Sequence, residues 1–169
     1  TASSTDTVAY FASTGGATTD ISIVARGVIT SGLADIGEYI EVVGDEEEYR
    51  QGDVVSVSVS DPTKFEKASR AYDSRLAGII TTTAGLVAGG GADSHGSRIL
   101  ALAGRVPVKV SGANGSIAVG DALTSSDAAG YAMRATRLGR VVATALEPFS
   151  GTSASASPSA SASASTPAA

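Results

Sequence analysis

Short runs of apolar residues that alternate with polar residues recur along most of the chain. The clearest run is Val-Val-Ser-Val-Ser-Val at residues 54–59. Alternation with a period of two puts every second side chain on one face of a sheet, so it predicts a half-buried strand. Strand-like runs also lie at residues 39–43, 65–69, 76–81, 99–110, 117–124, 131–136 and 138–143. Twenty glycines and only five prolines indicate many tight turns and little helix. The pattern predicts an all-β fold of short strands.

Part of this pattern occurs twice. The matching segments are Gly-Asp at residues 52–53 and 120–121, the runs at 65–69 and 131–136, and the runs at 77–81 and 138–143. In such a Gly-Asp turn, glycine takes a positive φ and aspartate caps the loop. We therefore predict a compact barrel or β-clip-like domain with an internal strand repeat. The strand at residues 99–110 is expected near its centre, where Pro107 marks an edge or a bulge.

The chain divides into three parts: an arm at residues 1–32, a β-rich body at 33–150 and a tail at 151–169. The arm contains two sticky strand-like segments. It is expected to form either the first hairpin of the domain or an extended arm that adds a strand to a neighbouring subunit. In the second case the predicted subunit-interface residues are Val8, Tyr10, Phe11, Ile21, Ile23, Val24, Val28 and Ile29.

The tail consists of Ser, Ala, Thr and Pro after Gly151 and carries no charged side chain. Its composition is typical of a disordered linker, and Ser/Thr with Pro is also typical of an O-glycosylated stalk on an exported protein. We expect an ordered outer segment, held by a neighbouring subunit, by sugars or by both. The candidate glycosylation sites are Thr152, Ser153, Ser155, Ser157, Ser159, Ser161, Ser163, Ser165 and Thr166.

Composition narrows the classes of function. Hydrophobic residues make up 43% of the chain but aromatic residues only 5%, so we expect a core of Val, Ile, Leu and Ala. The net charge of −5 and the lack of a basic stripe argue against binding to nucleic acid. The absence of cysteine excludes disulfides and thiolate metal sites. No stretch approaches the roughly 20 apolar residues of a membrane helix, so no membrane span is predicted.

Candidate chemistry is sparse. His95 is the single histidine, and it lies close to Ser94 and Ser97 in a glycine-rich segment at residues 86–97, which we expect to be a flexible loop. Neighbouring loop residues seldom adopt triad geometry, and the Gly-x-Ser-x-Gly elbow is missing. The acidic residues 45–48 lack the pattern of a calcium loop and are typical of a solvated face. We predict no catalytic residue, no cofactor and no metal ion.

Several blocks of the body together resemble a known domain. They are Asp-Ile-Gly-Glu-Tyr at 35–39, Gly-Asp-Val-Val at 52–55, Tyr-Asp-Ser-Arg-Leu-Ala-Gly-Ile-Ile at 72–80, Ala-Gly-Arg-Val-Pro-Val-Lys-Val at 103–110 and Gly-Asp-Ala-Leu-Thr-Ser-Ser at 120–126. This combination is similar to a β-rich C-terminal domain of bacterial surface and tail-fibre-like proteins, and to the peptidase G2 (intramolecular chaperone autoprocessing) domain of phage appendages. The resemblance covers about residues 33–148. It implies an extracellular, oligomeric and β-rich context.

The chain departs from that family after the end of the body. The phage domain cleaves itself to release a chaperone, whereas here the Ser/Ala tail takes the chaperone's place, so no catalytic residue is carried over. We expect a non-enzymatic structural subunit of an extracellular, pilus-like filament or surface appendage, in which the protein binds itself as a homopolymer and carries glycans. The alternatives are an autoprocessing appendage domain and a carbohydrate-binding adhesin, although low aromatic content disfavours an adhesin groove.

Overall fold

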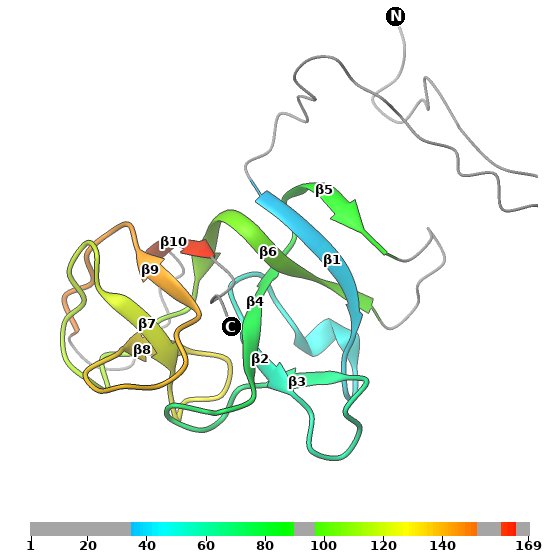
Figure 1. Ribbon diagram of the computed structural model, residues 1–169, viewed down its shortest axis with the longest axis horizontal. Coiled ribbons are helices and arrows are strands. Elements are labelled where there is room, and N and C mark those ends of the chain that lie inside the picture. The colour runs from blue at the N-terminus through cyan, green and yellow to red at the C-terminus, as the bar shows by residue number, and fades with distance from the viewer. Residues whose placement is uncertain (1–34, 90–96, 152–159, 165–169) are drawn as a thin grey trace, which may run out of the picture. The chain divides into compact units, whose positions relative to one another are not determined.

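The described part of the protein is all-β. The structure, a computed structural model, describes residues 35–89, 97–151 and 160–164 (Figure 1). These residues form ten strands and one short 3-10 helix, η1 (Glu46–Glu48). The strands are β1 (Asp35–Glu41), β2 (Val54–Val57), β3 (Phe65–Lys67), β4 (Leu76–Thr81), β5 (Ala84–Ala88), β6 (Ser97–Val108), β7 (Ala122–Ser125), β8 (Ala132–Arg134), β9 (Ala143–Ala145) and β10 (Ala160–Ala164).

The strands form two open sheets, so the predicted barrel is wrong. Paired strands follow the path β3-β2-β4-β6-β10-β9-β7-β8, and its end strands β3 and β8 do not pair with each other. Both end strands are instead bridged to neighbouring chain segments. Val42 bridges Phe65 of β3, and Val110 bridges Ala132 of β8, in each case in parallel.

The strand repeat is visible in the pairing. In the first copy β2 lies between β3 and β4, and in the second copy β7 lies between β8 and β9, with every pair antiparallel. The registers also match. Val55 faces both Lys67 and Gly78, and Leu123 occupies the same place opposite Arg134 and Ala143. The two three-stranded units are therefore structural equivalents, but the predicted match of residues 77–81 with 138–143 is out of register, because Ala143 and not Gly139 is equivalent to Gly78.

The long strand β6 extends this equivalence to the rest of the body. Its first half pairs with β1, placing Leu100 opposite Glu38. Its second half pairs with β10, placing Val106 opposite Ala162. Hence β6 ends the first repeat (β1–β4 and residues 97–104) and begins the second repeat (residues 105–108 and β7–β10). Pro107 lies in the second half, where β10 is the only described partner strand, as expected for a residue without an N–H.

One segment of the tail therefore belongs to the body. Residues 160–164 form β10, whose backbone pairs with β6 on one side and β9 on the other. Within the second repeat, β10 occupies the position that the first half of β6 occupies in the first repeat, since Ile80 faces Leu100 and Ala145 faces Ala162. The boundary predicted at residue 151 thus does not separate the body from the whole of the tail.

The two Gly-Asp turns have the predicted geometry. Gly52 has φ +85° and Gly120 has φ +91°, values that an L side chain rarely adopts. In each turn the aspartate carboxylate accepts a hydrogen bond from the backbone N–H three residues earlier. Arg50 donates to Asp53 and Ala118 donates to Asp121, both at 2.8 Å. Local turn chemistry therefore begins the central strand of each repeat.

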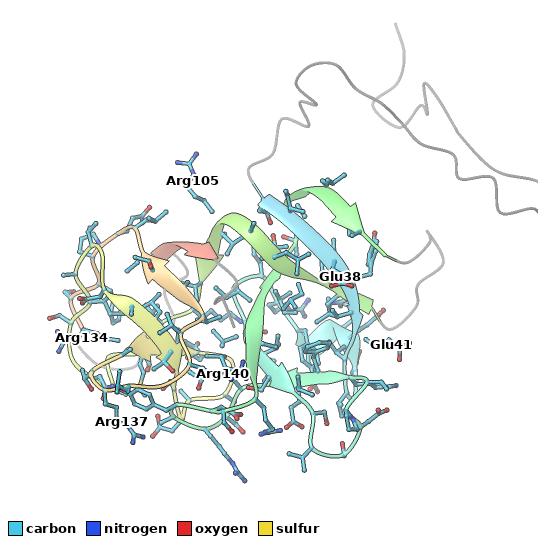
Figure 2. The ribbon with its side chains drawn as sticks, in the orientation of Figure 1. Glu38, Glu41, Arg105, Arg134, Arg137 and Arg140 are labelled. Carbon is cyan, nitrogen blue, oxygen red and sulfur yellow. The ribbon has the colours of Figure 1, made fainter. Side chains whose placement is uncertain are left out.

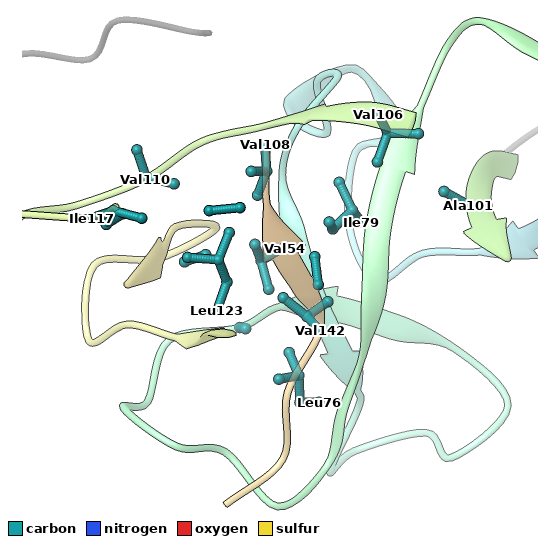
Figure 3. Close-up of a cluster of buried hydrophobic side chains, with 14 residues drawn as sticks. Val54, Leu76, Ile79, Ala101, Val106, Val108, Val110, Ile117, Leu123 and Val142 are labelled. Atoms are coloured by element: carbon teal, nitrogen blue, oxygen red, sulfur yellow. The ribbon is translucent and has the colours of Figure 1, made fainter. Parts of the chain in front are cut away.

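Two hydrophobic clusters fill the body with mainly aliphatic residues, as the composition predicted. The larger cluster contains residues of both repeats, including Val54 and Ile79 from the first and Leu123 and Val142 from the second (Figure 3). The smaller one is confined to the first repeat, where Tyr49 packs with residues such as Val55 and Ile80. Because the larger cluster is shared, the repeats stabilise each other through apolar burial.

Strand β5 was missed by the sequence pattern. Residues 86–88 lie within the segment predicted as a loop, yet Ala84–Ala88 runs parallel to β1. The sequence Ala-Gly-Leu-Val-Ala has no period of two. Its position on β1, not its own pattern, therefore accounts for this strand.

A buried carboxylate joins the two repeats. Asp53 is only 1% exposed, and Lys109 donates to its Oδ1 at 2.5 Å. Lys67 lies 3.4 Å from the other carboxylate oxygen. The contact with Lys109 is long-range, because Lys109 comes directly after the second half of β6. Asp121, the equivalent residue in the second repeat, has no ion pair among the described residues.

We expect Asp53→Asn to lower the free energy of unfolding by about 2–4 kcal/mol, because two part-buried lysines lose their only carboxylate while the amide can still accept from Arg50 N–H. The matched variant Asp121→Asn, at an equivalent turn with no lysine, should change stability by less than about 0.5 kcal/mol. Urea unfolding of both variants measures the difference. Equal losses would contradict the role given to the lysines.

Candidate interaction surface

Most of the predicted site residues lie outside the described residues. All eight predicted interface residues of the arm fall within residues 1–34. Of the candidate glycosylation sites, Ser161 and Ser163 lie in β10, opposite Pro107 and Arg105 of β6, and the other seven fall outside the described ranges. His95 and Ser94 are also outside, and Ser97 begins β6. The predictions made for residues outside the described ranges therefore stay predictions.

The acidic stretch is held by arginines of the first repeat. Asp45 caps η1 by accepting from Glu47 N–H at 2.9 Å. Arg98 of β6 contacts Glu46 at 3.6 Å and Glu47 at 3.2 Å.

Within the described ranges, no group of three or more acidic, His or Cys residues could hold a metal ion. Likewise, no described helix is long and apolar enough to cross a membrane.

The two repeats differ in charge. Among described residues, the first repeat contains eleven acidic and six basic side chains, and the second contains three acidic and five basic ones. Figure 2 places Glu38 and Glu41 on one side of the body and Arg134 and Arg137 on the other. The net charge of −5 therefore conceals an acidic side and a basic side.

Tyr72 forms the centre of the basic side. Its φ of +56° makes it the one described non-glycine residue in the left-handed region, which is costly for an aromatic residue. Its hydroxyl accepts from Thr136 N–H at 2.8 Å and from the Asn114 side-chain amide at 3.2 Å. Tyr72 comes from the first repeat and both partners from the second. These bonds hold the ring in place across the boundary between repeats.

Three arginines, Arg134, Arg137 and Arg140, lie in or after β8, and one of them stacks on this ring. The Arg137 guanidinium is 4.2 Å from the centre of the Tyr72 ring, a cation–π contact. Arg134 donates to the backbone oxygen of Asn114 at 3.0 Å. Arg140 is exposed, and no ion pair joins any of the three to a described acid. We call Tyr72, Asn114, Arg134, Arg137, Leu138 and Arg140 the arginine surface.

Leu138 gives this surface an apolar centre. It is 100% exposed, between Arg137 and Arg140 in the sequence. The adjacent Gly139 lies tight against the ring, since a Cβ there would be 2.9 Å from Tyr72 Cδ1. Arginine and tyrosine are enriched in protein interfaces, and a preorganised side chain loses little entropy on binding. The surface therefore suits a partner that carries carboxylates around an apolar contact.

The sequence pattern missed the arginine surface. The spacing Arg134, Arg137 and Arg140 is visible in the sequence, but the runs at 131–136 and 138–143 indicate only strands. Of that second run, only Ala143 is in a strand, β9. Tyr72 could not be connected to these arginines, because 64 positions separate it from Thr136. The cluster of arginines around an apolar residue was the one available signal.

Comparisons with protein-family models, with curated proteins and with solved structures found no match. The resemblance to the autoprocessing domain of phage appendages therefore stays a prediction.

We expect Tyr72 to ionise below the ordinary tyrosine pKa of 10.0 and Tyr49 to ionise above it. Hydrogen bonds from Thr136 lower the pKa of Tyr72. Burial, followed by the charges of Glu66 and Glu48, raises the pKa of Tyr49. Because ionised Tyr49 is disfavoured in the fold, its contribution to stability is lost as the pH rises above 10.0. The contribution of Tyr72 is instead gained as the pH rises through its lowered pKa toward 10.0, and it is fully present above 10.0.

Phenolate absorbance measured against pH tests this prediction. Tyr72→Phe should remove the component that ionises early, and Tyr49→Phe the component that ionises late. Thr136→Val should move the pKa of Tyr72 upward, because the hydroxyl bond to the phenolate is lost. An unchanged titration in Thr136→Val would show that Thr136 does not set the pKa of Tyr72.

Proposed function

We propose that the protein is a structural subunit of an extracellular filament or surface appendage. Subunits assemble through β-strand contacts, in which the arm of one copy adds a strand to a sheet of the next. The tail carries O-linked sugars on the outside of the assembly. The proposal concerns a homopolymer without enzymatic activity.

The observation that carries this proposal is the edge of β5. In the described residues β5 pairs only with β1, so its other edge has no partner strand. Exposed N–H and C=O groups on an edge are a template for a strand from another chain. Leu86, at 60% exposed, lies on this strand. The strand-like arm, rich in β-branched residues, supplies a segment of the right kind.

Deleting residues 1–32 should convert assemblies into soluble monomers, because the added strand is removed while the body keeps its core. Electron microscopy and sedimentation measure the result. Filaments formed by the truncated protein would refute the arm as the donor.

A point substitution tests the acceptor edge without shortening the chain. Leu86→Lys should strongly reduce assembly, because a lysine on an edge strand disfavours pairing with another chain. Val119→Lys is the matched control, since Val119 is similarly exposed at 64% but lies outside every strand. If both variants assemble as the wild type does, β5 is not the acceptor.

Intact mass of protein from its native source should exceed the sequence mass by hexose-type increments. We expect peptide mapping to place them mainly at residues 152–159, 165 and 166, because residues 160–164 have their backbone paired in the sheet. Ser161 and Ser163 therefore act as internal controls. An unmodified mass would remove the glycan from the proposal.

A further inference from the structure

We infer that the arginine surface of one copy docks on the acidic side of the next copy, joining subunits head to tail. This inference rests on the proposed self-assembly and adds a second contact to it. The acidic side consists of the exposed acids of β1 and of the segment around η1, namely Glu38, Glu41, Asp45, Glu47 and Glu48. Figure 2 shows representatives of both surfaces on different sides of one body.

Charge complementarity identifies a second copy as the partner. The second repeat is basic by two charges and the first repeat is acidic by five, so each copy carries both halves of a matched pair. Opposite potentials on facing surfaces steer association and fix its orientation. Because the two surfaces are different, the contact is heterologous and repeats without closing unless the rotation between copies forms a ring. Such a contact produces an elongated assembly.

The residue types on the two surfaces support a specific contact. The cations of the second repeat that form no ion pair with a described residue are arginines, and the planar guanidinium group can bind a carboxylate through two hydrogen bonds. The one lysine of the second repeat, Lys109, instead donates to Asp53. On the acidic side, Glu38 and Glu48 form no ion pair with a described residue and are exposed. These two glutamates are free to receive arginines.

The apolar residues of the two surfaces also correspond. Leu138 is fully exposed and lies between Arg137 and Arg140 in the sequence, and Ile36 (44% exposed) lies on the same face of β1 as Glu38, two residues away. A contact that excludes water around Leu138 would strengthen the surrounding ion pairs, which are weak when exposed. Assembly should therefore slow as ionic strength rises, because salt screens the steering charges.

Charge reversal tests the inference with two complementary variants. The double variant Arg137→Glu with Arg140→Glu makes both surfaces acidic, and the double variant Glu38→Lys with Glu48→Lys replaces the two acceptor glutamates, which form no ion pair with a described residue, by cations. Each alone should elongate at least tenfold more slowly than the wild type. An equimolar mixture should recover elongation, because reversed surfaces fit each other and native surfaces fit each other in an alternating polymer. Arg105→Glu, an exposed reversal outside the arginine surface, should leave elongation unchanged.

Light scattering and electron microscopy follow elongation, and circular dichroism confirms that each variant is folded. If the wild type assembles and the reversed variants assemble equally well alone, the inference falls while the proposed function stands. The inference also falls if the folded variants stay monomeric when mixed. If the arginine variant assembles normally but no longer binds dextran sulfate, the surface binds an anionic glycan instead. A wild type that remains monomeric at every ionic strength overturns the proposed function itself.

Discussion

The fold depends on one strand shared by two repeats. β6 pairs with β1 and β4 through its first half and with β10 through its second half. The change of partner occurs at Gly104, which faces both Asp35 of β1 and Ala164 of β10 and has φ +120°. Only glycine adopts that conformation without strain. Because neither repeat has its own complete set of strands, we expect the two to unfold as one cooperative unit.

Local patterns predicted the central elements of the fold well. The alternating run at residues 54–59 predicts β2 through its side-chain period, and the two Gly-Asp turns mark the start of the central strand of each repeat through the conformation of glycine. The patterns failed where pairing alone creates a strand. Ala-Gly-Leu-Val-Ala in β5 has a single β-branched residue, and Ala-Ser-Ala-Ser-Ala in β10 has none. The barrel prediction was wrong because it required the end strands β3 and β8 to pair, and these strands do not pair with each other.

The candidate surface was less predictable than the fold, because it depends on contacts between distant residues. Tyr72 and Arg137 come from different repeats, and nothing local indicates that the ring lies beneath the guanidinium. The difference in charge between the repeats was equally hard to predict, because the net charge of the chain is the sum over an acidic repeat and a basic one. Dividing the charges between repeats required knowing where the first repeat ends, and the pairing of β6 supplies that boundary.

Divergence between equivalent positions explains how one chain can acquire complementary sides. The bridges of Val42 and Val110 place Glu41 and Lys109 at equivalent positions, and these two residues carry opposite charges. Lys109 forms its ion pair within the chain, because it donates to the buried carboxylate of Asp53 in the first repeat. Arg134, Arg137 and Arg140 of the second repeat therefore form no ion pair with a described acid, while the first repeat keeps surplus acids. A tandem repeat whose equivalent positions differ in charge does not pair its charges fully within the chain, and the proposed head-to-tail contact would use this imbalance.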